Sequence, residues 1–312
     1  MGRLQCAKRK KCWGIKRSKS TGSREENYMI YAMTCADSNY MPCAEFHMKT
    51  AKKRGKVDKT IICNIEELDE EFRNKNQKIL SSGEGRRRGF YIWKPYYVNK
   101  VLSQLQYGDF LIYLDSAGFY YRNDVHEIVS YMIENNIDMV GTRRFSYLDK
   151  HWTRRDTFVY MGCDTPEYTD KRQCMGGCFI LQKTEKTVKL IQEWIDFAQN
   201  YQIIADTENT CGLDNYNGFV AHRHDQSIMS ILQTKYHVVT IEEIPVADFY
   251  VYHHTMETSV RRVKKQLAKI RREQIKKSIQ KKDIKNIYYI ERERYRNISC
   301  IQRRRRLKFS KS

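Results

Sequence analysis

The chain has 312 residues and a formal net charge of +20, with 41% apolar and 12% aromatic residues. This composition excludes a disordered chain, and a glycine count of only 15 excludes a collagen-like repeat. No apolar run approaches the roughly 20 residues of a membrane-spanning helix, and the N-terminal residues lack the apolar stretch of a signal peptide. We therefore expect a globular, cytoplasmic protein.

The positive charge is concentrated at the two ends of the chain. Residues 1–24 carry nine basic and no acidic side chains, and residues 261–312 carry 21 basic and four acidic ones. Residues 25–260 therefore have a net charge of −6. We expect a basic flexible arm over 1–24, one α/β domain over 25–259 and a basic helical tail over 260–312.

Strands and helices are predicted to alternate along the domain. Apolar, β-prone runs predict strands at 28–36, 59–64, 110–114, 137–141 and 238–241. Charged or amphipathic segments predict helices at 43–53, 65–80, 96–106, 125–135, 188–201 and 228–235. This alternation indicates an open, mixed but mainly parallel sheet that is flanked by helices.

A carboxylate follows the most apolar strand. Residues 110–114 (FLIYL) are apolar on both faces, so this strand is expected at the centre of a covered sheet, and Asp115 comes directly after it. Ligands bind at the carboxyl ends of strands in such sheets, where a carboxylate can hold a divalent cation that neutralises a diphosphate. The alternative is that Asp115 only begins a turn with Ser116 and Gly118.

An Arg- and Gly-rich segment precedes the helix predicted at 96–106. Arg88 is the last of three consecutive arginines, and a guanidinium group matches a phosphate in geometry. Lys94 precedes Pro95 at a helix N-terminus, a position suited to an anion. Trp93 would stack on a base or sugar. A solvated basic loop and an aromatic residue in the core are the alternatives.

Two glycines interrupt the second half of the domain. Gly176 and Gly177 would either let the backbone approach a substrate closely or form a tight turn. The flanking Cys174 and Cys178 lack the spacing of a structural zinc knuckle, so we expect reduced, partly buried thiols.

Three segments occur in a fixed order: GRRRGFYIWKPYYVNKVL (85–102), YGDFLIYLDSAG (107–118) and HRHDQSIMSIL (222–232). Together they resemble GT-A-fold glycosyltransferases of polysaccharide and surface-glycan synthesis, over roughly residues 28–255. The resemblance implies a GT-A-like fold and the transfer of a sugar, expected to be a hexose, from a nucleotide-sugar donor to a glycan or lipid-linked acceptor. It leaves open whether the transfer retains or inverts the anomeric configuration.

The resemblance also implies a metal site. Asp115 corresponds to the first acidic residue of the Asp-x-Asp motif that binds a divalent cation, Mn²⁺ or Mg²⁺, and the donor diphosphate. Ala117 stands at the second acidic position, so the need for a metal stays open. His253 or His254 would be the third metal ligand, and the alternative for both is a surface or helix-capping histidine.

Asp225 and Gln226 are the implied catalytic pair. They resemble the Asp-Gln pair of retaining enzymes, which lies beneath the anomeric carbon of the sugar and contacts its hydroxyl groups. Asp225 would stabilise the developing cation, or orient or deprotonate the acceptor, whereas Gln226 can only orient or stabilise. Asp225 as a helix cap is the alternative, and it is compatible with catalysis.

The basic tail has apolar residues at helical spacing, at Val260, Val263, Leu267 and Ile270. Such a helix would bind an anionic membrane surface or a partner, bind nucleic acid, or pack on the domain. No nucleic-acid-binding module accompanies it. We therefore favour a glycosyltransferase held peripherally at the inner membrane surface over a nucleic-acid-binding protein with a degenerate enzyme-like core.

Overall fold

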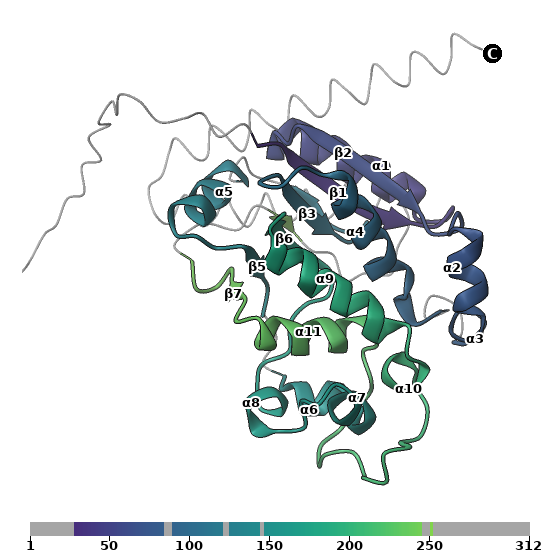
Figure 1. The fold of residues 1–312 in the computed structure, drawn as a ribbon. Helices are drawn as coiled ribbons and strands as arrows, with labels where there is room; N and C mark the ends of the chain where they lie inside the picture. Colours follow the sequence, from purple (N-terminus) through teal and green to yellow (C-terminus); the bar gives the residue numbers. More distant parts are fainter. Residues whose placement is uncertain (1–27, 84–88, 121–124, 144–146, 245–249, 252–312) are drawn as a thin grey trace, which may run out of the picture.

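The computed structural model describes residues 28–83, 89–120, 125–143, 147–244 and 250–251 (Figure 1). At its centre is a six-stranded sheet in the order β2-β1-β3-β6-β5-β7. Its strands are β1 (Ile30–Ala36), β2 (Lys59–Asn64), β3 (Phe110–Leu114), β5 (Met139–Gly141), β6 (Cys178–Gln182) and β7 (Val239–Thr240). Only β6 runs antiparallel to its neighbours. The prediction of a mixed, mainly parallel sheet is confirmed.

The remaining elements surround this sheet. The longer helices are α1 (Met41–Thr50), α4 (Trp93–Gln104), α5 (Val125–Glu134), α9 (Glu185–Ala198) and α11 (Asp225–Lys235). The shorter ones are η1 (Ala51–Gly55, a π-helical turn), α2 (Glu70–Lys75), α3 (Gln77–Leu80), α6 (Asp149–Trp152), α7 (Arg155–Tyr160), α8 (Pro166–Thr169) and α10 (Tyr201–Ile204). Two short strands, β4 (Phe119–Tyr120) and β8 (Tyr250–Val251), pair separately from the main sheet.

Alternate residues of β3 pack on opposite faces of the sheet. Phe110, Ile112 and Leu114 join an apolar cluster with residues of α1, η1 and α5. Leu111 and Tyr113 join the larger cluster with residues of α4, α9 and α11, and Figure 1 shows α9 and α11 on that side. All five residues are buried, as the run of apolar residues predicted for a central strand.

The helices differ from the sequence predictions mainly at their ends. Helix α4 begins at Trp93, three residues before the predicted start, with Pro95 in its first turn, where a backbone N–H has no helical partner. Helix α9 begins earlier because Thr184 and Thr187 form a capping box. The stretch 65–80 contains only the short helices α2 and α3, and the polar region 142–172 contains α6, α7 and α8.

Several predictions made from the sequence concern residues outside the described ranges. They include Arg88, His253 and His254, the arm over 1–24 and the tail over 260–312. Within the described ranges, no helix is long and apolar enough to cross a membrane. No disulfide links the cysteines of these ranges, and Cys174 and Cys178 are fully buried, whereas the sequence predicted partly buried thiols.

A buried carboxyl on α6 makes the stability of the fold depend on pH. Asp149 accepts a hydrogen bond from Ser230 Oγ at 2.9 Å, and burial raises its pKa to about 7. In an unfolded chain an aspartate titrates near pH 3.9. Between these pH values the folded state holds the extra proton, so raising the pH lowers the free energy of unfolding.

We therefore expect Asp149→Asn to gain stability relative to the parent by up to about 1.4 kcal/mol per pH unit between roughly pH 4 and 7. The measurement is denaturant unfolding of both proteins across this pH range. A difference in unfolding free energy that does not change with pH would contradict the burial of an ionisable Asp149.

Candidate functional site

Asp115 lies where the carboxyl end of β3 meets the amino end of β6. The two strands pair at Leu114 and Cys178, and the Asp115 amide donates to the Gly177 carbonyl at 2.9 Å. The Gly118 amide donates to the Asp115 carbonyl at 2.7 Å, which closes a turn. Asp115 thus begins a turn, as the alternative interpretation predicted, and also presents a carboxylate that is 26% exposed.

A buried lysine lies between two carboxylates at this edge of the sheet. Lys94 Nζ is 3.0 Å from Asp225 Oδ2 and 3.6 Å from Asp115 Oδ1, and it donates to the Gly176 carbonyl at 3.3 Å. The side chains of Lys94 and Asp225 are 7% and 3% exposed. An ammonium group has three donors, and three oxygen atoms surround it here. Lys94 therefore holds the two carboxylates together.

Aromatic rings enclose the same ammonium group. The ring centroids of Tyr91, Trp93 and Tyr113 lie 5.7, 5.9 and 5.6 Å from Lys94 Nζ, within the range of cation–π attraction. Burial raises the pKa of Tyr113 well above its usual value, so its hydroxyl stays protonated and donates to Asp115 Oδ1 at 2.7 Å. Tyr113 therefore helps to orient Asp115.

The protonation states of the pair follow from this burial. Burial raises the pKa of Asp225 to about 6, although the nearby Lys94 ammonium opposes the shift. Burial alone would lower the pKa of Lys94, but the charges of Asp115 and Asp225 outweigh it and raise that pKa. Lys94 is thus charged at neutral pH, and Asp225 is ionised above about pH 6.

The first turn of α11 is fixed in place by neighbouring side chains. Trp194 Nε1 donates to the Asp225 carbonyl at 3.0 Å, and Gln226 Nε2 donates to Gln173 Oε1 at 3.0 Å. A Cβ atom at Gly176 would come within 2.9 Å of Gln226 Cβ. Gly176 therefore lies in a turn that packs closely against α11, where the sequence predicted either close approach to a substrate or a tight turn.

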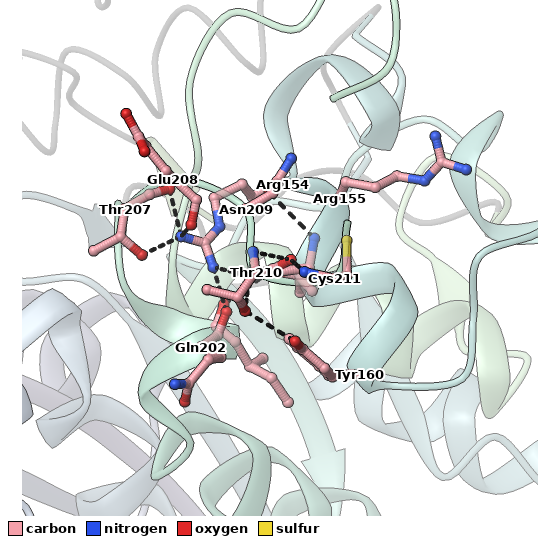
Figure 2. A network of polar contacts seen from close by, with 12 residues as sticks. Arg154, Arg155, Tyr160, Gln202, Thr207, Glu208, Asn209, Thr210 and Cys211 are labelled. Atoms are coloured by element: carbon pink, nitrogen blue, oxygen red, sulfur yellow. Dashed lines mark hydrogen bonds and ion pairs between the residues drawn. The ribbon is translucent and has the colours of Figure 1, made fainter. Parts of the chain in front are cut away.

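A buried arginine holds the segment between α10 and α11 (205–224) in place through hydrogen bonds (Figure 2). Arg154 donates to the carbonyls of Gln202, Thr207 and Glu208, and its Nη2 atom lies 2.9 Å from Asp156 Oδ2. Its backbone amide donates to His222 Nδ1 at 3.3 Å. Arg154 thus binds the beginning and the end of the segment between α10 and α11.

Asp156 binds the middle of the same segment. Its carboxylate accepts from the backbone amides of Thr210 and Cys211, each at 2.9 Å. Burial alone would raise the pKa of Asp156, but the hydrogen bonds from Cys211 and Thr210 outweigh it and lower that pKa, so the carboxylate stays ionised beside Arg154. The network holds a long irregular segment immediately before the Asp225-Gln226 pair.

The structure brings together most of the site residues predicted from the sequence. Lys94, Asp115 and Asp225 form the buried cluster, with Gly177 bonded to Asp115 and Gln226 following Asp225. Trp93 and the half-buried Ser116 border it. Sequence reasoning missed the contributions of Tyr113, Gln173 and Trp194, because each occurs in an ordinary apolar or polar stretch. Arg88, His253 and His254 lie outside the described residues.

The described part of this site does not fit a divalent cation. Ala117 stands at the second acidic position of the motif, and the Lys94 ammonium lies 3.6 Å from the Asp115 carboxylate. Over the described ranges no three His, Cys, Asp or Glu side chains are grouped so that they could hold a metal ion.

No protein-family model matches the sequence, and no curated protein matches it. Some solved structures resemble the fold. Mouse xyloside xylosyltransferase 1, in its apo form, is 12% identical over 68% of this chain and 83% of that chain, with a TM-score of 0.38. Core-mannan synthase A from Aspergillus fumigatus, in a Mn/GDP form, is 10% identical over 74% of this chain and 76% of that chain, with a TM-score of 0.36.

The bifunctional glycosyltransferase WbbM is 9% identical over 70% of this chain, with a TM-score of 0.41, and this chain covers 40% of its length. These neighbours are glycosyltransferases, the class that the sequence segments resemble.

The buried Arg154–Asp156 pair yields a prediction about the segment between α10 and α11. We expect Asp156→Asn to lower the free energy of unfolding by about 3–5 kcal/mol, because it leaves a buried guanidinium without its counter-charge. Hydrogen exchange should also accelerate at the amides of Thr210 and Cys211. Denaturant unfolding and exchange measured by mass spectrometry test the two effects.

Asp138→Asn is the matched control, because Asp138 pairs with the exposed Lys186 at 3.6 Å. Loss of a surface pair should cost about 1 kcal/mol or less and leave the exchange of Thr210 and Cys211 unchanged. Equal effects of the two variants would contradict the conclusion that the Arg154–Asp156 pair holds the segment between α10 and α11 in place.

Proposed function

We propose that this chain is a glycosyltransferase that moves a sugar, expected to be a hexose, from a nucleotide-sugar to a glycan or lipid-linked acceptor. One observation carries the proposal: a buried Lys94 ammonium holds Asp115 and Asp225 together at the carboxyl edge of an open α/β sheet. Ligands of such sheets bind at this edge. A buried charged cluster with a raised carboxyl pKa in that position is characteristic of an active site.

Asp225 is proposed to act on the reacting sugar. Glycosyl transfer passes through an oxocarbenium-like transition state, which an ionised carboxylate stabilises. With a pKa of about 6, Asp225 is mostly ionised at neutral pH. Lys94 keeps this carboxylate in place, and the Gln226 amide, held by Gln173, would orient a hydroxyl group of the sugar. Whether the configuration is retained or inverted depends on where the acceptor binds.

The donor would bind beside Asp115. Its partly exposed carboxylate, Ser116 and the Gly177 backbone lie on the turns at the sheet edge, and Trp93 offers a ring for a base or sugar. Arg88 is proposed to contact the diphosphate. If a Mn²⁺ or Mg²⁺ ion takes part, it would neutralise the diphosphate, and His253 and His254 would have to supply the ligands that the described residues lack.

The proposal for the basic tail rests on its sequence. A cationic amphipathic helix over 260–312 would hold the enzyme at an anionic membrane surface, where lipid-linked acceptors are found. No observation in the described structure favours the nucleic-acid-binding alternative.

The site assignment predicts that Asp115 and Asp225 are both needed for activity. Asp115→Asn and Asp225→Asn keep the shape of each side chain, and each leaves Lys94 one carboxylate, so we expect the variants to lose stability but still to fold, and to lower kcat by about 100-fold or more. The assay is hydrolysis or transfer from a panel of nucleotide-sugars, with and without Mn²⁺, by the purified full-length chain.

Asp109→Asn is the matched control, because Asp109 is a buried carboxylate at the opposite, amino end of β3. It accepts backbone hydrogen bonds from Met29 and Gln106, so its loss should lower stability and not the rate of the folded enzyme. Unchanged activity in both site variants, or an equal loss in the control, would refute the assignment.

The raised pKa of Asp225 predicts the acidic limb of the pH profile. Because the ionised carboxylate is the active form, kcat/KM should rise about tenfold per pH unit below roughly pH 6 and level off above it. The residual activity of Asp225→Asn should show no such rise in kcat/KM between acidic and neutral pH. A profile that is flat between pH 4.5 and 7, at about constant stability, would show that Asp225 does not act in its ionised form.

A further inference from the structure

A left-handed turn lies immediately before the lysine of the site. Gly89, Phe90 and Tyr91 have φ angles of 69°, 50° and 62°, and the Ile92 amide donates to the Gly89 carbonyl at 2.9 Å. Glycine adopts this conformation freely, but two bulky aromatic residues in a row do so only against steric opposition. Such strain persists where the surroundings enforce it, and it is commonest at functional sites.

A second strained residue lies immediately before Asp225. His224 has φ 52° and ψ −120° and precedes the first residue of α11. In the described part of the chain, six non-glycine residues have a positive φ. Three of them, Phe90, Tyr91 and His224, adjoin the Lys94–Asp225 pair, which indicates that the strain is concentrated at the site.

The two strained segments contact each other through their rings. The ring of Phe90 stacks on that of His224, with centroids 4.9 Å apart and planes 28° from parallel, and the two residues are 5% and 3% exposed. The next ring, that of Tyr91, lies 6.2 Å from His224 and 5.7 Å from Lys94 Nζ. The left-handed turn thus places the Phe90 ring on His224, the residue before Asp225. It also places the Tyr91 ring near both His224 and Lys94.

The other side of His224 is also held. Its Nδ1 atom lies 3.0 Å from the Ile204 carbonyl of α10, and its ring contacts that of His222 at 5.2 Å. The imidazole is therefore confined between Phe90 on one side and Ile204 and His222 on the other. Without Phe90, the backbone at His224 would be free to relax to a negative φ, which would turn the first residue of α11 and move its carboxylate.

We propose that Phe90 and His224 are positioning residues, whose stacked rings hold Asp225 at ion-pair distance from Lys94. This inference rests on the proposed function, since it assigns the stack a role in the chemistry of that site. It requires neither residue to touch the substrate. The stack should matter for the rate of the chemical step and much less for binding of the donor.

The test compares Phe90→Leu, Phe90→Tyr and Phe72→Leu in the full-length chain. Phe90→Leu removes the aromatic ring but keeps an apolar side chain, whereas Phe90→Tyr keeps an aromatic ring that can stack on His224. Phe72 is the control, because it is also buried and its ring lies 4.1 Å from that of Tyr96. Tyr96 is two residues beyond Lys94 and so lies on a different face of α4.

We expect Phe90→Leu to lower kcat by about tenfold or more, because small displacements of a reacting group are costly, while the KM for the nucleotide-sugar changes less than about twofold. Phe90→Tyr should recover most of the rate. Phe72→Leu should destabilise the fold and leave kcat unchanged. Equal kinetic effects of Phe90→Leu and Phe72→Leu, or a change confined to KM, would overturn the positioning role.

A second measurement does not depend on turnover. A crystal structure of Phe90→Leu should show His224 with a negative φ and Asp225 no longer at ion-pair distance from Lys94, whereas the parent and Phe72→Leu should keep the pair. If the parent proves inactive on every nucleotide-sugar but this difference appears, the proposed function fails and the positioning of Asp225 stands. An unchanged pair in Phe90→Leu would refute the positioning role whatever the activity.

Discussion

The site depends on one buried positive charge. An ammonium group removed from water must be surrounded by oxygen atoms or it loses its proton, and Lys94 finds three of them, on Asp225, Asp115 and Gly176. These belong to the start of α11, the end of β3 and the turn before β6. The requirement of a single side chain therefore fixes three separate parts of the chain at one edge of the sheet. Removing one partner from such a group is expected to cost several kcal/mol.

The surrounding fold is arranged so that this cluster stays rigid. The antiparallel strand β6 brings Gly177 beside Asp115, and the absence of a side chain at Gly176 lets α11 approach closely. Trp194 holds the first residue of α11 from the side of α9. Strained residues and a buried arginine network lie just outside the cluster, and the apolar core stabilises them.

The sequence predicted the sheet well and the site in part. The strands at 59–64 and 110–114 match the structure to the residue, because short, β-branched and aromatic runs bounded by polar residues have few alternatives. The association of Asp115 with Asp225 followed from a resemblance. The sequence indicated Lys94 as an anion-binding residue at a helix N-terminus, but nothing in the local pattern indicated that its ammonium would pair with Asp115 and Asp225, because these contacts link residues far apart in the chain. The left-handed turn at Phe90 was equally hidden, since tertiary contacts impose it against local preference.

We propose that Lys94, Asp115 and Asp225 form one donor-binding centre. The decisive measurement is a crystal structure of the full-length chain with a bound nucleoside diphosphate. We expect the diphosphate to lie at the carboxyl edge of the sheet, beside Asp115, with the ion pair of Lys94 and Asp225 intact. A nucleotide bound elsewhere, such as at the amino end of β3 near Asp109, would contradict it.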